Sequence, residues 1–245
     1  MTRAQLLAVA LVTLATASAH ADELADPYVY QRAGGGGEAW TVELDSAVGT
    51  RETVDGVEEA LHVRRALLDG RLLLSASGGV LLDARSGDVS ASGGALEGAW
   101  QLADVGAGVR LTLTGGWAHD YRGADLARAR ALLGRRFGRL DVTASSTFEV
   151  PFASDRDAVD VILGAGVAYR LAPSLHAGVE AVGEDLEGFF AAEEAEGGAR
   201  LLFGPTLAWR VGAVDLRVNA GGVLQATGQE TRSGWLGRLV LATSF

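Results

Sequence analysis

Arginine and carboxylate side chains recur at alternate positions in several short stretches of this sequence, and they are its main candidates for chemistry. Arg128 and Arg130, for example, are separated by a single alanine. Guanidinium and carboxylate groups held in rows can order a small charged or sugar-like solute through charge-assisted hydrogen bonds. The residues that we expect to share one such surface are Arg64, Glu97, Arg110, Arg128, Arg130, Glu149, Asp160, Arg170, Glu180 and Arg217.

The elements that must position these side chains are β-strands. Stretches of about ten residues alternate apolar and polar positions, as where Trp40 and Leu44 share one side and Glu43 and Asp45 the other. This period of two predicts strands with one apolar face. The twelve strands that we expect lie near 38–45, 57–68, 71–82, 96–102, 109–117, 126–137, 140–150, 159–169, 175–179, 201–209, 214–218 and 234–245.

The connections between these strands alternate in length. Tight turns are expected near residues 69, 104, 138, 173 and 212, and longer loops near 46–56, 83–93, 118–125, 151–157, 183–198 and 226–234. Tight turns fix the register, which places opposite charges across from each other and favours that pairing. The expected pairs are Arg136 with Asp141, Arg128 with Glu149, Arg210 with Asp215, and Glu97 with Arg110.

The stretch 234–245 carries a more specific pattern. Its apolar residues 235, 239, 241 and 245 share one parity, Arg238 and Ser244 the other, and the sequence ends on Phe245. It resembles the closing strand of bacterial outer-membrane β-barrels, and the general pattern extends over 38–245. The resemblance implies an all-β fold, a transmembrane antiparallel up-and-down β-barrel of twelve strands. It also implies recognition of the terminal strand by the barrel-insertion machinery. It matches no single named family, so no functional residues transfer.

A porin-like barrel of this kind has short turns at the periplasmic rim and long loops outside. Both barrel termini would then be periplasmic, the apolar faces would contact outer-membrane lipid, and the charged pairs would line a polar interior. A soluble, lipocalin-like barrel with its apolar face inward is the alternative. Arg65 is the residue that departs most from this pattern, since it shares a parity with apolar residues. Either its guanidinium extends along the wall to the interface, or a bulge shifts the alternation of inward and outward residues there. Aromatic girdles at the two interfaces are expected from Trp40, Trp100, Trp117, Phe148, Tyr169, Trp209, Trp235 and Phe245.

The first residues have the pattern of a secretory signal. Arg3 precedes an apolar run over 4–17, and Ala19-His20-Ala21 offers a small-residue cleavage site. We expect a signal peptide over 1–21, Sec export, a flexible periplasmic leader over 22–37 and the barrel over 38–245. The sequence has no cysteine, which excludes a disulfide framework, a thiolate metal site and a lipidated N-terminal cysteine.

Charge and motifs limit the partners. The formal net charge is −10, which argues against nucleic-acid binding. Six acids in the loop 183–198 could attract cations or a partner, but a solvated loop is the favoured interpretation. No metal-ligand spacing and no phosphate-binding glycine motif occurs, so no metal and no cofactor is expected. The sequence does not indicate an oligomeric state.

Three functions stay open at this point. The first is a narrow outer-membrane channel for small polar or charged solutes. The second is an outer-membrane enzyme that acts on lipid or peptide at the outer rim, with His119, Asp120, Asp155 and Asp157 as candidate groups. The third is a plugged structural or adhesive barrel that presents its acidic loop.

Overall fold

The computed structural model describes residues 40–51, 54–84, 86–102, 109–152, 159–190, 199–227 and 230–245. These residues form twelve antiparallel strands: β1 (Trp40–Arg51), β2 (Val54–Leu67), β3 (Leu72–Asp83), β4 (Val89–Leu102), β5 (Val109–His119), β6 (Asp125–Phe137), β7 (Leu140–Pro151), β8 (Asp160–Ala172), β9 (Leu175–Glu184), β10 (Ala199–Val211), β11 (Val214–Thr227) and β12 (Glu230–Ser244). A single 3-10 turn, η1 (Leu186–Phe189), follows β9. No helix among the described residues is long and apolar enough to cross a membrane.

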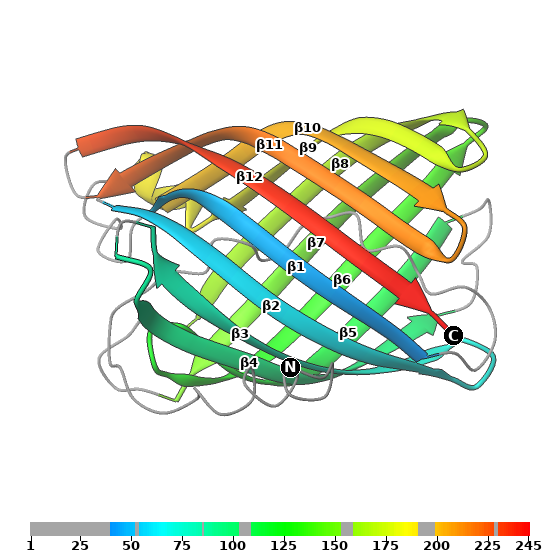
Figure 1. Cartoon of the computed structure of the whole chain (residues 1–245), viewed down its shortest axis with the longest axis horizontal. Helices are drawn as coiled ribbons and strands as arrows, with labels where there is room; N and C mark the ends of the chain where they lie inside the picture. Colours follow the sequence, from blue (N-terminus) through cyan, green and yellow to red (C-terminus); the bar gives the residue numbers. More distant parts are fainter. Residues whose placement is uncertain are drawn as a thin grey trace, which may run out of the picture.

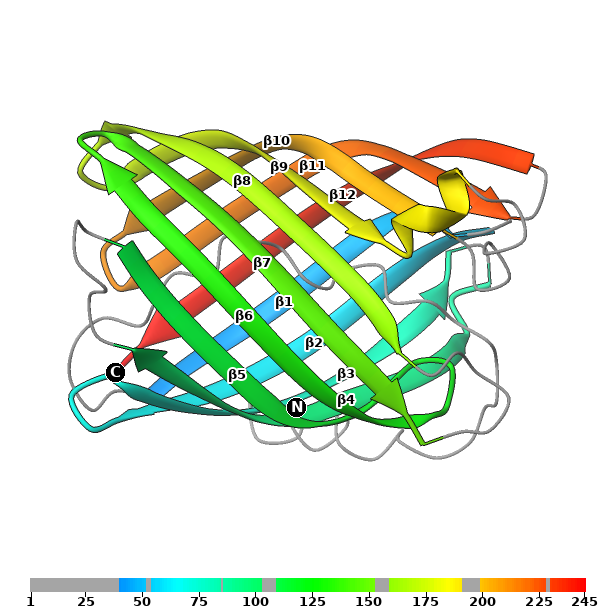
Figure 2. The ribbon, with the colours of Figure 1, turned by 180° about the vertical axis from the view of Figure 1, so that it is seen from behind.

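The strands close into one barrel in which each strand pairs with its neighbours in the sequence (Figures 1 and 2). The ring is completed by β1 and β12, which pair from Thr41 opposite Ser244 to Gly49 opposite Leu236. Backbone bonds in both directions between Trp40 and Phe245, each 3.0 Å, extend this seam to the short-turn rim. The closed antiparallel twelve-stranded barrel confirms the predicted fold class.

Residues that alternate along each strand lie on opposite faces of the barrel wall. In β8, the even-numbered residues from Asp160 to Ala168 are buried in the interior, whereas the odd-numbered residues that alternate with them point outward. On the outer face, Leu163 is 47% exposed and Leu207 39%. Apolar groups therefore cover the outside, and the buried charged groups lie on the inside together with buried apolar ones, so the outer face is not the polar face of a lipocalin-like barrel.

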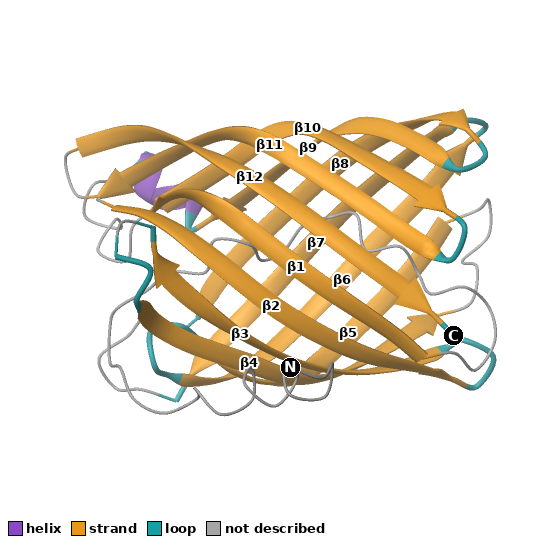
Figure 3. Cartoon of the chain, in the orientation of Figure 1, coloured by secondary structure: helices purple, strands orange, loops and turns teal. Residues whose placement is uncertain are grey.

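Among the described residues, strands make up the wall, and turns and the short helical turn η1 lie at its two rims (Figure 3). At the short-turn rim, Gly138 (φ 60°) and Gly212 (φ 61°) open two-residue turns in the left-handed region, as the sequence predicts. The turn near residue 69 is longer than expected: β2 ends at Leu67, β3 begins at Leu72, and Leu68, Asp69 and Gly70 all have positive φ.

Two predicted loops are largely strand. β1 extends to Arg51 and β2 begins at Val54, so most of the expected loop 46–56 belongs to the wall; β11 and β12 likewise take up most of 226–234. The sequence obscures these extensions because polar side chains enter the outer face there, beside apolar ones such as Val48. Ser46, for example, faces Glu59 and donates a hydrogen bond of 2.7 Å to its carboxylate.

Arg65, the residue that fitted the pattern worst, lies on the outer face. β2 pairs without interruption with both β1 and β3, so no bulge changes its phase. The guanidinium instead lies over the ring of Trp40, 4.9 Å from its centroid. Arg135 lies in the same way over Phe137. These cation–π contacts give outward arginines a partner near the short-turn rim.

Candidate functional site

The candidate site is the concave face of the barrel. All ten residues predicted to line the interior lie at inward positions of their strands. Five are buried: Arg128, Arg130, Glu149, Asp160 and Glu180. The other five are half-buried: Arg64, Glu97, Arg110, Arg170 and Arg217. The eight predicted girdle residues lie on the outer face and are 41–76% exposed.

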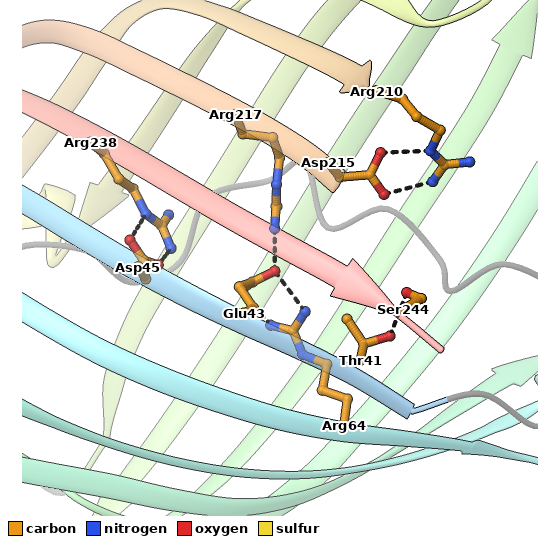
Figure 4. Close-up of polar contacts among 9 residues, drawn as sticks. All are labelled: Thr41, Glu43, Asp45, Arg64, Arg210, Asp215, Arg217, Arg238 and Ser244. Atoms are coloured by element: carbon orange, nitrogen blue, oxygen red, sulfur yellow. Dashed lines mark hydrogen bonds and ion pairs between the residues drawn. The ribbon is translucent and has the colours of Figure 1, made fainter. Parts of the chain in front are cut away.

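A cluster of five charged groups crosses the closing seam (Figure 4). Glu43 of β1 accepts two hydrogen bonds from Arg64 of β2, at 3.0 and 2.9 Å, and a third from Arg217 of β11, at 2.5 Å. To reach Glu43, Arg217 extends over β12. Asp45 accepts a pair of hydrogen bonds from Arg238 of β12, one of them at 2.7 Å from Nε. We call these five residues the seam cluster; its formal charge is +1, from three arginines and two carboxylates.

A second charged group lies on the wall formed by β4 to β7. Arg128 Nε is 2.6 Å from Glu149 Oε1, and Arg128 NH1 is 3.9 Å from Glu97 Oε1. Gly116 of β5 faces Glu97 on one side and Arg128 on the other, and its lack of a side chain lets the two meet across it. The neighbouring Arg130 donates a 3.0 Å hydrogen bond to the hydroxyl of Thr147.

Three of the four predicted charge pairs form. Besides Arg128 and Glu149, Arg136 bonds Asp141 at 2.6 and 3.3 Å, and Arg210 bonds Asp215 at 2.7 and 2.6 Å. Each lies across one of the two glycine turns.

The fourth predicted pair, Glu97 with Arg110, is wrong. A tight turn near residue 104 would bring the two side chains together, but β4 and β5 pair in a different register, in which Leu102 lies opposite Leu111. Glu97 faces Gly116, and Arg110 faces Gly134 on β6 near the short-turn rim.

The remaining predicted interior residues have varied surroundings. Arg170 donates to the carbonyl of Gly138 at the short-turn rim, at 3.2 Å. Glu180 accepts a 3.0 Å hydrogen bond from Asn219, while its Oε1 has no hydrogen-bond partner among the described residues. Asp160 lies at the first position of β8, opposite Glu149. The inward charges thus extend from one rim to the other.

A cavity of about 80 Å³ lies between the seam cluster and the β4–β7 wall. One water needs roughly 10–15 Å³, so the cavity has room for several. Its charged and polar lining includes Asp45, Glu58, His62, Arg64, Ser75, Ser77, Glu97, Thr114, Tyr121, Arg128, Arg130 and Arg238. This lining can hydrate and orient a small polar solute.

Sequence reasoning did not single out several of these lining residues. Arg238 and Asp45 are 193 residues apart in sequence, so only barrel closure brings them together. Tyr121 lies in a connection, where no period indicates its direction.

Glu43, Asp45 and His62 place one ligand atom each within 4.8 Å of one another, a spacing that could suit a metal ion. Both carboxylates, however, already bond arginines, and the three guanidiniums of the seam cluster oppose another cation. The geometry therefore gives no support for a metal here.

Of the candidate groups for an enzyme, the two that the structure describes, His119 and Asp120, do not form one site. His119 Nδ1 is 2.9 Å from Asp125 Oδ1, both on the exposed outer face. Asp120 is buried and accepts the backbone N–H of Ala124 at 2.8 Å, which makes it part of a turn. Asp155 and Asp157 lie outside the described residues.

The closed antiparallel wall, the apolar outside and the charged concave face define a porin-like β-barrel. No protein-family model matches the chain, and no curated protein does.

Solved structures with a similar fold are outer-membrane barrels. The NanC porin gives a TM-score of 0.59 at 9% identity, over 82% of this chain and 98% of that one. The KdgM porin in complex with disordered oligogalacturonate gives 0.55 at 10% identity, over 83% and 99%. An outer membrane channel from Pseudomonas putida F1 gives 0.61 at 14% identity, over 90% and 99%. At these identities the likeness is one of fold.

Proposed function

We propose that this protein is a narrow outer-membrane channel for small polar or charged solutes, with an interior lined by arginines and carboxylates. The observation that carries the proposal is the cavity of about 80 Å³ among inward charges, inside a wall whose outer face is apolar. Such a barrel offers a polar path through a medium that otherwise excludes charge.

The ion pairs suit this role because they hold the guanidiniums in fixed positions. Arg64 and Arg238 each bond a carboxylate through two nitrogens while also lining the cavity. Arginine has five N–H donors, so two bonds to a carboxylate leave others for a passing solute. The solved KdgM complex contains an oligogalacturonate; we extend from it only the idea that the solute is polar.

The proposed placement in the envelope follows the asymmetry of the rims. Trp40 and Phe245 meet at the short-turn rim. We place this rim in the periplasm, after a cleaved signal peptide over 1–21 and a leader over 22–37. The strand ending at Phe245 would be the element that the insertion machinery recognises, and the exposed aromatics would form the two girdles. Protease added to intact cells should then cut within 183–198 and spare the short turns. Cleavage near residues 138 and 212 instead would reverse the orientation.

One observation favours a second candidate, a plugged barrel with a structural role. Toward the long-loop rim, buried apolar side chains such as Leu81 and Leu236 occupy the interior. If they seal the lumen, no solute crosses.

Liposome swelling separates these two functions. The purified, refolded protein should let small sugars, amino acids and organic acids enter vesicles, with rates that fall as solute size rises. Vesicles with heat-denatured protein are the control. Swelling no faster than this control, for every solute, would remove the channel and leave the plug.

A further inference from the structure

The connection between β5 and β6 folds into the barrel instead of standing above it. Asp120 and Tyr121 are 7% and 4% exposed. The backbone N–H of Asp120 donates to the carbonyl of Ala124 at 2.9 Å, and the Asp120 carboxylate accepts the N–H of Ala124 at 2.8 Å. Gly123 completes the turn with φ +83°. The turn is thus closed by its own hydrogen bonds and presents Tyr121 inward.

The wall has a recess that fits the Tyr121 ring. Gly93 of β4 faces the ring, where an added Cβ would lie 3.2 Å from Cε1; at Gly79 of β3 an added Cβ would overlap the tyrosine hydroxyl. That hydroxyl donates to Glu58 Oε1 of β2 at 3.1 Å. The Tyr121 side chain, which comes from the connection after β5, therefore packs against two inward glycines and one carboxylate on three successive strands.

Tyr121 also completes an apolar layer across the lumen. The buried members of this layer are Ala47, Leu81, Ala91, Tyr121, Val223 and Leu236, with Leu202 packed against them. They come from β1, β3, β4, β10, β11, β12 and the β5–β6 connection. Leu202 also packs against Ile162 of β8 and Val182 of β9, so the apolar contacts continue along the wall.

An ion pair ties the same turn to the far wall. Arg122 NH2 lies 3.8 Å from Glu184 Oε1 at the end of β9, and Glu184 also bonds Arg200 of β10 at 2.8 Å. The turn therefore has anchors at β2 and β9, on either side of the lumen. The charged cavity, which Tyr121 also lines, lies next to the layer.

From this geometry we propose that Tyr121 is the size-determining residue of the channel. The inference rests on the proposed channel function and deepens it: a solute that crosses the apolar layer must pass the Tyr121 ring. Substrates are then limited to compact polar molecules of monosaccharide or amino-acid size, and the charged cavity acts on what the ring admits.

The test compares Tyr121→Ala with Tyr121→Phe and the wild type. Each protein is measured by single-channel conductance in planar bilayers and by liposome swelling with a mono-, di- and trisaccharide. Removal of the ring should raise conductance about twofold or more, because the narrowest part of a pore dominates its resistance, and should admit the trisaccharide. Phenylalanine keeps the ring but loses the bond to Glu58, so it should keep the wild-type size limit.

A second pair of variants moves the ring without altering it. Gly79→Ala would overlap the tyrosine hydroxyl, whereas Gly78→Ala adds a methyl group on the outer face, with only the Gly93 carbonyl at 4.0 Å. We expect Gly79→Ala to shift the size limit toward that of Tyr121→Ala, and Gly78→Ala to match the wild type. Heat-modifiable migration on gels checks that each barrel has folded.

The outcomes separate the two proposals. If the wild type conducts and a folded Tyr121→Ala keeps its conductance and size limit, Tyr121 does not set the limit and the channel function stands. If neither protein conducts, the channel proposal itself fails. If Tyr121→Phe admits the trisaccharide as readily as Tyr121→Ala, the hydrogen bond and not the ring sets the limit, and the inference is overturned.

Discussion

The apolar layer and the charged middle of the lumen lie next to each other on the same strands, yet they are built in opposite ways. On β1, Glu43 and Asp45 bind arginines, while Ala47, two residues further, packs in the layer. On β12, Arg238 and Leu236 show the same change over two residues. The wall is continuous, and only the inward side chain changes. In the proposed channel, this difference separates two tasks: the apolar layer limits the size of the solute, and the charged middle interacts with the charge of the solute.

The largest expected effect comes from breaking the seam cluster. Glu43→Ala leaves Arg64 and Arg217 without their shared carboxylate in a buried site, and removal of one partner from a buried ion pair costs about 3–5 kcal/mol. We expect that loss in the free energy of unfolding, measured by urea titration in lipid vesicles with tryptophan fluorescence. The matched control is Glu230→Ala, which removes the exposed partner of Arg232 and should cost at most about 1 kcal/mol. Equal costs would contradict the distinction between buried and rim pairs.

The corresponding change in the apolar layer is Leu81→Ala. Leu81 is fully buried, and deletion of a buried leucine side chain costs about 2–5 kcal/mol. Unlike Glu43→Ala, it should also raise conductance, since it enlarges the layer without removing a charge. Leu74→Ala, on the outer face of the same strand at 46% exposure, is the control and should leave conductance unchanged. An effect on stability alone would mean that the layer does not limit flow.

A smaller effect is expected where the charged wall depends on a glycine. A Cβ at Gly116 would lie 2.2 Å from the Leu96 carbonyl oxygen, 2.8 Å from Glu97 Cα and 2.9 Å from Glu97 Cγ. Gly116→Ala should therefore destabilise the barrel by about 1–3 kcal/mol, the usual cost of overpacking. Gly115→Ala, which meets nothing within 4 Å, should be close to neutral in the same urea titration. If the two variants are alike, Glu97 and Arg128 do not depend on this gap.

The smallest change concerns selectivity. Arg130→Gln removes one positive charge from the cavity lining and keeps a donor for Thr147. The reversal potential under a KCl gradient should shift toward cations, with little change in conductance. Arg232→Gln, at an exposed position of the long-loop rim, should shift it less. If Arg232→Gln shifted the reversal potential more than Arg130→Gln, the charges that determine ion selectivity would lie at the long-loop rim.

The features of this molecule that the sequence predicts are those determined by residues that are close together in the chain. Alternation places Leu163 outside and Asp160 inside, and a glycine turn fixes the partner of Arg136 within five residues. The interior contacts that the sequence did not predict depend on the register of β4 against β5 or on closure of the barrel. Glu97 was misassigned because a turn near residue 104 implies a different register from the one in which Glu97 faces Gly116, and Asp45 meets Arg238 only when the first strand pairs with the last. The position of Tyr121 was not predicted because the glycines that its ring packs against lie on other strands.

Both proposals require that a path for polar solutes runs through this barrel and is narrowed by the apolar layer that Tyr121 completes. Single-channel recording of the folded wild-type protein in a planar bilayer tests it most directly. We expect small, discrete current steps at moderate voltage, and larger steps from Tyr121→Ala under the same conditions. A silent bilayer for both proteins, after heat-modifiable migration has shown that both are folded, would contradict it.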